Sequence, residues 1–304
     1  MAGTGYNILI NDKSGTVLNM GIPAIEAAIA SSGIQVAELC FSEPQDMADN
    51  LARLAALPEP LLVGGGDGTI RECAKSLAKY KKPFGVLPFG TMNLLAHDLN
   101  ITTLADALKA YAVGAIDEAI DAGFVNGEIF LCCASIGTMP QASVYREEIR
   151  KRNNILLIPQ MFLFVLANLE KNKKQRIVLE VDGVMRKFHS AGVVIADNRF
   201  ADSDKLTESN FKRGSLKEGE LAAYVATTKT QASHLRFLMR LLFGHWLKDP
   251  DMTELVGKRM KLWTRRKREL VSIDGEVLKL ETPLAFDIKP HHVHVLIPGE
   301  ASGE

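Results

Sequence analysis

The stretch Leu61-Leu62-Val63-Gly64-Gly65-Gly66-Asp67-Gly68-Thr69-Ile70 decides the fold of this chain. Its first three residues form a short aliphatic run of the kind that a buried parallel strand shows. Four of the next five residues are glycines, and apolar residues then recur at helical spacing, at Ile70, Ala74 and Leu77. The pattern predicts a strand, a tight glycine-rich loop and a helix.

A glycine-rich loop in this position is suited to binding an anion. Its backbone N–H groups can approach a phosphate closely, and the start of the helix adds a favourable dipole. The loop has neither the Gly-Lys-Ser/Thr ending of a P-loop nor the G-x-G-x-x-G frame of dinucleotide folds. Because it holds no lysine, phosphate charge would be met by amides, a metal ion or residues from elsewhere. A turn whose glycines serve geometry alone is the alternative, and the loop by itself does not decide between them.

The composition is that of an ordinary globular protein of about two domains. Lys and Arg total 36, equal to Asp and Glu, so no overall positive charge favours nucleic acid. The four cysteines lack metal-ligand spacing, which favours reduced thiols in a cytoplasmic protein: Cys40, Cys73, Cys132 and Cys133. We expect no signal peptide. The apolar stretch 155–169 is too short and too interrupted to predict a membrane span.

Strands and helices alternate in the N-terminal part of the sequence. Strand candidates at 6–10, 34–41, 61–63 and 84–87 are separated by helical patterns. This alternation predicts a parallel sheet that helices cover on both faces. Ligands bind such sheets beyond the carboxyl ends of the strands. Polar or glycine-rich loops begin after three of the strands, at Asn11, Gly64 and Gly90, and we expect them to converge on one edge.

From about Asp121 the sequence favours antiparallel β-structure. Asn126-Gly127 and Asp182-Gly183 lie between strand-like runs and predict hairpin turns. Further strand candidates lie at 191–196, 221–227, 259–263, 270–273 and 292–297, with helices at 161–169 and 234–246. We therefore predict an α/β domain over 1–120 and a mainly antiparallel β-sandwich domain over 121–289.

Four motifs, in order along the chain, resemble a known family. Gly65-Gly66-Asp67-Gly68-Thr69 is similar to a signature shared by diacylglycerol, sphingosine and ceramide kinases and, more distantly, by NAD kinases. Pro88-Phe89-Gly90-Thr91-Met92-Asn93 resembles the second signature of the lipid-kinase branch, residues 11–15 its first nucleotide loop, and Ile273-Asp274-Gly275-Glu276 its late Asp-Gly-Glu. The resemblance covers nearly the whole chain. It implies a nucleotide-binding domain to which the terminal segment 290–304 returns, a β-rich lipid-substrate domain, and an active site between them.

The resemblance also implies an activity and its residues. The chain would be a lipid kinase that uses ATP and Mg²⁺ to phosphorylate a hydroxyl of a diacylglycerol- or sphingoid/ceramide-type lipid. Asp274 and Glu276 would be the catalytic carboxylates, and Asp67 and Glu276 would hold Mg²⁺ through its waters. The residues implied to bind the nucleotide are Asn11, Asp12, Lys13, Ser14, Gly15, Ser42, Gly64, Gly65, Gly66, Asp67, Gly68, Thr69, Ile70 and Thr91. These residue types suit phosphoryl transfer, which needs positioning, charge neutralisation and a carboxylate near the attacking alcohol.

Asp274 has a second interpretation. The dipeptide Asp274-Gly275 equals Asp182-Gly183, for which a simple hairpin turn suffices. If the strand continues past Gly275, the side chains of Asp274 and Glu276 lie on the same side, and if the chain turns there, they diverge. The sequence leaves this open.

Two other functions stay open, one because the signature at Gly65–Thr69 is shared with NAD kinases and one because the chain departs from the family pattern. Arg71 stands where many relatives have Asn, and 94–97 differs from the usual Asp-Phe-Ala-Arg. Glu218-Gly219 stands where some bacterial relatives have an Asp-Gly associated with a structural metal, so we do not predict that metal. The alternatives are a kinase for a soluble substrate, similar to NAD kinase, and a non-catalytic module that binds a nucleotide or a membrane.

A lipid acceptor implies contact with a membrane surface. We expect a cytoplasmic protein, with peripheral attachment to the inner face of the membrane as an option, no nucleic-acid partner, and a homodimer left open. Segment 234–243 mixes cationic and apolar residues, and core packing of its apolar side is favoured over membrane docking. His292 and His294 share one strand face, where solvated histidines, or histidines satisfied by a hydrogen-bond partner, are favoured over a metal site.

Overall fold

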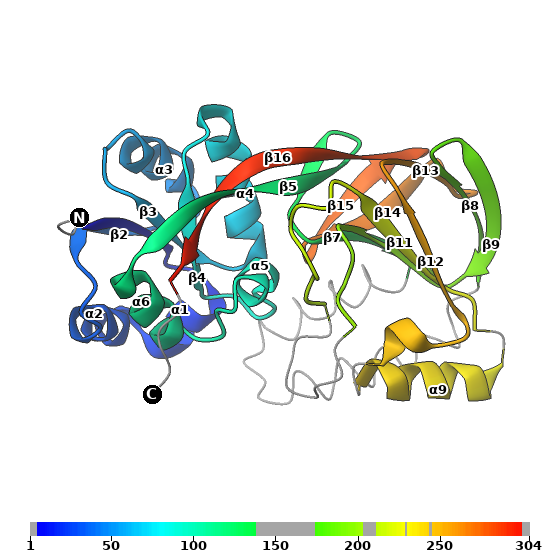
Figure 1. Ribbon diagram of the computed structural model, residues 1–304, viewed down its shortest axis with the longest axis horizontal. Coiled ribbons are helices and arrows are strands. Elements are labelled where there is room, and N and C mark those ends of the chain that lie inside the picture. The colour runs from blue at the N-terminus through cyan, green and yellow to red at the C-terminus, as the bar shows by residue number, and fades with distance from the viewer. Residues whose placement is uncertain (1–4, 138–173, 203–210, 229, 243–244, 300–304) are drawn as a thin grey trace. The chain divides into compact units, whose positions relative to one another are not determined.

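The protein is described from a computed structural model, which defines residues 5–137, 174–202, 211–228, 230–242 and 245–299 (Figure 1). The chain forms two compact units. The first unit comprises Met1–Ile120 and His291–Glu304, and the second comprises Asp121–Pro290. The second unit is thus inserted into the first. The predicted helix at 161–169 lies outside the described residues.

The first unit is built on a parallel sheet. Its strands are β1 (Tyr6–Asn11), β2 (Val36–Ser42), β3 (Leu61–Gly65) and β4 (Phe84–Pro88), in the order β2-β1-β3-β4. All three neighbouring pairs are parallel, which confirms the predicted parallel sheet. Strand β16 (Leu284–Pro298) also pairs with β4 in parallel, through Val295 and Phe84.

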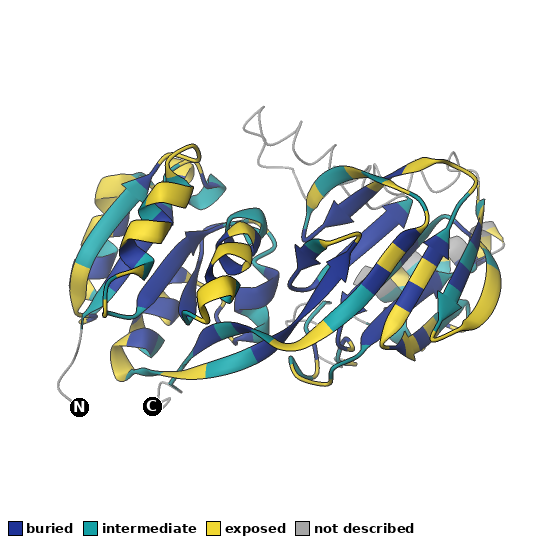
Figure 2. Cartoon of the chain, turned by 90° about the horizontal axis from the view of Figure 1, so that it is seen from above, coloured by how far each residue is buried: buried dark blue, intermediate teal, exposed yellow. Residues whose placement is uncertain are grey.

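Helices cover this sheet, with α3 on one side and α2 and α6 on the other (Figure 1). The helices are α1 (Gly15–Met20), α2 (Ile22–Ser31), α3 (Met47–Ala55), α4 (Asp67–Leu77), α5 (Leu94–Asp98) and α6 (Leu104–Val113), with a short 3₁₀ turn η1 (Ala78–Tyr80). Because both faces are covered, the aliphatic residues of β1 and β3 are fully buried, as Figure 2 shows for the central strands. Tyr111 of α6 joins β4 to β16, because its hydroxyl accepts from Val86 N at 2.9 Å and donates to Leu296 O at 3.2 Å.

The second unit consists of antiparallel strands. One sheet has the order β12-β11-β10-β7-β14-β15. Strands β13, β8 and β9 extend from β16 in the sheet that also contains β1 to β4. The bounds are β5 (Ala115–Val125, which begins in the first unit), β6 (Glu128–Phe130), β7 (Cys133–Gly137), β8 (Gln175–Val181), β9 (Val184–Ser190), β10 (Gly192–Asp197), β11 (Leu221–Ala226), β12 (Met252–Gly257), β13 (Arg259–Trp263), β14 (Arg268–Ile273) and β15 (Glu276–Glu281). Residues of both sheets share one buried cluster, including Leu179, Ile195, Val225, Leu262 and Ile273. The predicted antiparallel β domain is confirmed.

Three tight hairpin turns of this unit use the same backbone. Asn126-Gly127, Asp182-Gly183 and Asp274-Gly275 all have positive φ at both positions, from 46° to 88°. Such turns follow the right-handed twist of the strands they join, and they favour Asn or Asp followed by Gly. The two hairpins predicted from sequence are therefore confirmed, and a third lies at Asp274.

Helix α9 (Gln231–Leu242) is followed by the 3₁₀ turn η2 (Trp246–Lys248). The expectation that its apolar residues pack on the core is wrong for Leu235 and Met239, which are 58% and 44% exposed. In the part of the chain that the structure describes, every helix is too short or too polar to cross a membrane.

Candidate functional site

The loops after β1, β2 and β3 contact one another at one edge of the parallel sheet. Asn11, the last residue of β1, donates through Nδ2 to Thr69 Oγ1 of α4 at 2.9 Å. The backbone O of Asn11 accepts from Ser14 N, which closes the turn. Asp12 N donates to the O of Ser42, the last residue of β2, at 3.0 Å. The strand ends thus form one continuous polar edge.

The loop after β4 joins the same edge through Asp67. Asp67 Oδ1 accepts from Leu94 N at 2.6 Å, and Asp67 Oδ2 accepts from Asn93 N at 3.0 Å, at the start of α5. Asn93, with φ of 48°, bonds both to Gly90 N at 2.7 Å and to Gly90 O at 3.0 Å. Thr16 N donates to Phe89 O at 3.2 Å. The expected convergence of three loops on one edge is confirmed.

The glycines of this edge are needed for close packing. A Cβ on Gly90 would lie 2.6 Å from Gly66 Cα, and one on Gly64 would lie 2.7 Å from Phe89 Cε2. A Cβ on Gly65 would lie 2.5 Å from Thr69 Cβ. These distances explain the glycines by contact between loops. Phosphate binding by the same loop is a separate property, which stays a prediction.

Two buried polar atoms of this edge have no hydrogen-bond partner among the described residues. They are Ser14 Oγ, in a side chain 6% exposed, and Asp12 Oδ1. Buried polar groups in native proteins are nearly always paired, and leaving one unpaired costs about 1–3 kcal/mol. A hydroxyl that can donate and a carboxylate oxygen that can accept are the groups that a phosphate and a sugar hydroxyl require. The residues present therefore fit a nucleotide.

The other predicted residues of this edge differ in exposure. Lys13 is exposed, and its Nζ lies 3.4 Å from Asp12 Oδ2 and 3.5 Å from Glu43 Oε1. The hydrogen bond with Asp12, helped by the charges of both acids, raises the pKa of Lys13. The cation that the loop at Gly64 lacks is thus present on the neighbouring loop.

Gly15 and Thr91 are accessible, whereas Ser42 is buried. A Cβ on Gly15 would meet no atom within 4 Å, and Thr91 is exposed. The Ser42 hydroxyl donates to Glu43 O at 3.1 Å and accepts from Asn50 Nδ2 at 3.0 Å. It therefore serves hydrogen bonds inside the protein.

In the second unit, Asp274 binds backbone N–H groups. Its carboxylate accepts from Leu131 N at 2.7 Å and from Cys132 N and Cys133 N at 3.0 Å each, and the residue is 4% exposed. Asp274 N donates to Cys133 O. Three N–H donors stabilise negative charge on a buried carboxylate. Asp274 thus joins its turn to the segment that precedes β7.

Asp182 does the same at the equivalent turn. Its carboxylate accepts from Lys258 N and Arg259 N at 2.9–3.2 Å, and its N–H donates to Arg259 O. The hairpin interpretation of the Asp-Gly dipeptide therefore holds at both positions. A catalytic role for Asp274 is additional to this and stays a prediction.

The chain turns at Gly275, because Ile273 pairs with Glu276 across the hairpin. Asp274 is buried in this turn, whereas Glu276 is exposed at the start of β15. This settles the question that the sequence left open, since the two side chains diverge.

Sequence reasoning missed the contributions of Asn93 and of residues 131–133. Asn93 ends the second motif, and an Asn between a predicted strand and a predicted helix is a signal in the sequence, because Asn tolerates positive φ. Nothing in the sequence pointed to the three N–H groups near residue 132.

Of the tail histidines, His294 Nδ1 lies 2.9 Å from Asp117 Oδ1.

Comparison with known proteins gives the chain its family. Residues 6–125 match the family model described as diacylglycerol kinase catalytic domain. Residues 149–297 match the model described as YegS C-terminal NAD kinase beta sandwich-like domain. Together the two models span most of the chain, and each falls on the unit whose fold it describes.

The following relatives have low sequence identity to this chain, but each match covers most of it. A Bacillus subtilis diacylglycerol kinase is 27% identical over 83% of this chain and 83% of its own length. An uncharacterized protein of Synechocystis is 23% identical over 80% of this chain, which spans 55% of that relative. A Bacillus anthracis crystal structure whose name refers to a diacylglycerol kinase superposes with a TM-score of 0.70 at 20% identity, covering 99% of this chain and 98% of that one. At this identity the superposition shows the fold alone. From the two domain matches, the chain belongs to the family of lipid kinases that carry the diacylglycerol kinase catalytic domain.

Proposed function

We propose that this protein transfers the γ-phosphoryl group of ATP to a hydroxyl of a diacylglycerol- or sphingoid/ceramide-type lipid, with Mg²⁺ as the cofactor. The observation that carries the proposal is the polar edge of the first unit, where Asp67 joins two loops. On the same edge, the buried polar atoms of Asp12 and Ser14 lack a partner among the described residues. Family membership supports kinase activity and ATP use. The lipid acceptor is inferred from the second motif, at Pro88-Phe89-Gly90.

Each residue of the edge has a task in this proposal. Ser14 Oγ donates to a phosphate oxygen, and Lys13 neutralises part of the phosphate charge. The N–H groups at the start of α4 face the triphosphate, where the helix dipole favours negative charge. Holding the nucleotide in one geometry is the main contribution, because phosphoryl transfer depends on positioning and electrostatic stabilisation.

The residues also fit a hydrated magnesium ion. Asp67 has both oxygens oriented by backbone N–H groups, and a carboxylate offers about four acceptor positions in all. Mg²⁺ keeps several of its waters and is bound through one or two carboxylates plus the nucleotide phosphates. Asp67 would hold the ion through water, and the part of Glu276 in holding it stays a prediction from the sequence. When bound, it would neutralise charge on the phosphates.

The proton of the attacking hydroxyl is assigned to Asp274. Its carboxylate is held in one orientation by three N–H groups, so it would be presented to an alcohol without a reorganisation cost. It would take the proton as the new oxygen–phosphorus bond forms and the bond to the leaving ADP breaks.

The test is incubation of the purified protein with Mg²⁺ and γ-labelled ATP in the presence of a total lipid extract. The labelled product is then identified by mass spectrometry. We expect a phosphorylated lipid. Label transferred to added NAD instead would replace the proposal with a soluble-substrate kinase. ATP binding with transfer to neither acceptor would favour a non-catalytic module.

A further inference from the structure

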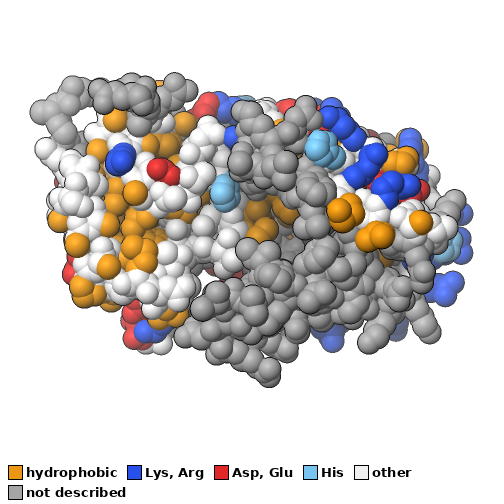
Figure 3. All heavy atoms as spheres, turned by 90° about the horizontal axis from the view of Figure 1, so that it is seen from below, with side chains coloured by type: hydrophobic (Ala, Val, Ile, Leu, Met, Phe, Trp, Pro, Cys, Tyr) orange, Lys and Arg blue, Asp and Glu red, His pale blue; other side chains and the backbone are white. Residues whose placement is uncertain are grey.

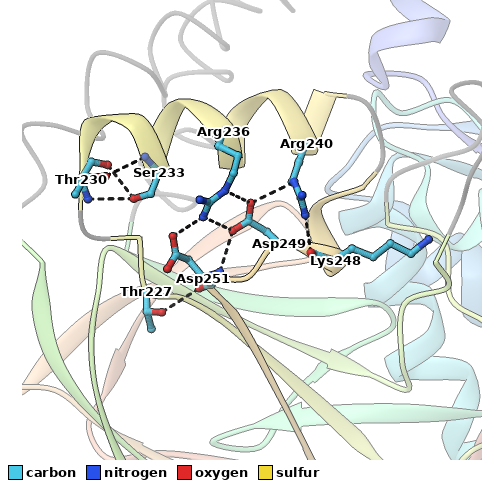
Figure 4. A network of polar contacts seen from close by, with 8 residues as sticks. All are labelled: Thr227, Thr230, Ser233, Arg236, Arg240, Lys248, Asp249 and Asp251. Carbon is cyan, nitrogen blue, oxygen red and sulfur yellow. Dashed lines mark hydrogen bonds and ion pairs between the residues drawn. The ribbon is translucent and has the colours of Figure 1, made fainter.

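Helix α9 turns its polar side toward its own protein. Arg236 Nε lies 3.0 Å from Asp249 Oδ2, and its Nη2 contacts Asp249 Oδ1 at 3.0 Å and Asp251 Oδ2 at 2.5 Å (Figure 4). One turn later, Arg240 Nε lies 3.6 Å from Asp249 Oδ2, and Nη1 donates to Lys248 O at 2.5 Å. Two arginines of one helix stripe thus share a single carboxylate.

The acidic partners are fixed to the β-structure. Asp249 is fully buried at its side chain. The backbone O of Asp251 accepts from Thr227 N at 2.8 Å, just beyond β11. Burial opposes ionisation of Asp249, but the hydrogen bonds from Arg236 outweigh it, and the pKa of Asp249 lies below its ordinary value. Arg236, Arg240 and Asp249, which together form a clamp between the helix and the β-structure, therefore stay charged at neutral pH.

The start of the helix is fixed as well. Thr230 Oγ1 accepts from Ser233 N at 3.1 Å, and Ser233 Oγ accepts from Thr230 N at 3.0 Å. This reciprocal pair is a capping box with Ser in its third helical position. Ser233 is buried, and with Arg236 and Arg240 it marks the stripe that faces the protein.

A neighbouring stripe of α9, about 100° around the helix from the arginines, is apolar and exposed. Ala232, Leu235 and Met239 follow one another at spacings of three and four residues, so they lie on one side of the helix. Leu235 is 58% exposed and Met239 is 44% exposed. In an ordinary surface helix the apolar stripe lies inward.

The cations beside this stripe are partly exposed, and an acid pairs with each of them. Residues 231–248 contain Arg236, Arg240 and Lys248 but no Asp or Glu. The three cationic side chains are 39%, 37% and 50% exposed. The shared Asp249 is not exposed, whereas Asp251, the second partner of Arg236, is 28% exposed and Asp202, the partner of Lys248, is 43% exposed. Figure 3 shows exposed hydrophobic side chains beside Lys and Arg on one face of the molecule. Apolar residues flanked by exposed cations match the interface of an anionic bilayer, where apolar groups enter the headgroup boundary and cations meet lipid phosphates.

We propose that the outward stripe of α9, formed by Ala232, Leu235 and Met239, docks on an anionic lipid bilayer. This deepens the proposed function, since a kinase that acts on a bilayer lipid must reach the bilayer. The clamp at Asp249 holds the helix so that its apolar side faces the membrane and its arginines lie at headgroup level.

The test is co-sedimentation with phosphatidylcholine vesicles, with and without added phosphatidylserine. The variant Leu235→Glu/Met239→Glu should bind the anionic vesicles at least about tenfold more weakly, because two apolar side chains are lost from the contact and two negative charges are added. The matched control is Val184→Glu/Met185→Glu, at an apolar pair of the same unit that is 60% and 66% exposed. It should bind as the unchanged protein does. Circular dichroism checks that both variants are folded.

Three results would overturn the docking proposal: no vesicle binding by the unchanged protein, equal loss in both variants, or loss of self-association in the α9 variant with vesicle binding intact. The last would assign the stripe to a second copy of the chain. Kinase assays on a short-chain acceptor separate this proposal from the proposed function. Docking predicts that the α9 variant keeps its rate there. Vesicle binding that behaves as expected without any lipid phosphorylation would leave docking standing and remove the kinase assignment.

Discussion

Ser14 and Ser42 are two buried serines on the same edge of the first unit, and they differ in what their hydroxyls bind. The Ser42 hydroxyl has two partners inside the protein, whereas that of Ser14 has none among the described residues. Ser42→Ala should therefore lower the free energy of unfolding by about 1 kcal/mol, and Ser14→Ala should leave it unchanged or raise it slightly. Urea unfolding without nucleotide measures both.

The same pair tests nucleotide binding. Ser14→Ala should weaken ATP binding about three- to tenfold, the equivalent of one hydrogen bond of about 1 kcal/mol, as measured by isothermal titration calorimetry. An unchanged affinity in a folded Ser14→Ala protein would remove Ser14 from the site.

Asp274 and Asp182 offer a second matched pair. In Asp182→Asn, the amide oxygen can still accept hydrogen bonds from the N–H groups of Lys258 and Arg259. In Asp274→Asn, the new NH₂ group cannot accept a hydrogen bond, yet it must face either Leu131 N or the N–H groups of Cys132 and Cys133. We expect the free energy of unfolding to fall by about 1–3 kcal/mol at position 274 and by less than about 1 kcal/mol at position 182.

Turnover separates the structural contribution of Asp274 from a catalytic one. Below the unfolding temperature of both variants, phosphorylation of lipid should fall at least about a hundredfold in Asp274→Asn, the size of a lost general base, and remain near normal in Asp182→Asn. Normal turnover by a folded Asp274→Asn protein would leave the residue with its turn alone.

At the scale of elements, the regular parts of the fold could be predicted from the sequence. The alternation of strands and helices, the edge where the loops meet, and the Asn-Gly and Asp-Gly turns all depend on local pattern, which the sequence contains. The orientation of α9 could not be predicted, because the arginines turn inward toward Asp249 and Asp251, whose positions depend on β11 and β12. The partners of Asp274 lie more than 140 residues away along the chain, so no local pattern indicates them.

The capping box of α6 gives a pH-dependent prediction. Asp106 accepts from Thr102 Oγ1 and from Thr103 Oγ1 and N, and these bonds, that from Thr102 first, hold the pKa of Asp106 below its ordinary value of 3.8. A depressed pKa in the folded state stabilises the protein above the ordinary value, and the stabilisation disappears as the pH falls through the folded pKa.

The unchanged protein should therefore be more stable than Asp106→Asn at about pH 7, with the difference shrinking below pH 3.8. Urea midpoints of both proteins at about pH 7 and about pH 3 measure this. A difference that stays constant with pH would contradict it.

At the scale of the whole molecule, β16 belongs to both units. Phe286 is in the buried cluster of the second unit, and Val295 is fully buried in the first. Both tryptophans, Trp246 and Trp263, lie in the second unit, so their fluorescence reports on that unit alone. If the shared strand couples the units, Val295→Ala, which should cost about 2 kcal/mol, will shift the fluorescence midpoint and the circular dichroism midpoint together. A shift in circular dichroism without one in fluorescence would show independent unfolding.

The route of β16 also sets the order in which a nascent chain can fold. Strands β1 to β4 leave the ribosome early, but the segment that lies against β4 is translated only after the entire inserted unit. Until then β4 presents an open edge, which in other proteins invites pairing with foreign strands. The first unit to be synthesised is therefore the last to be completed, because the edge of β4 stays unpaired until the end of translation.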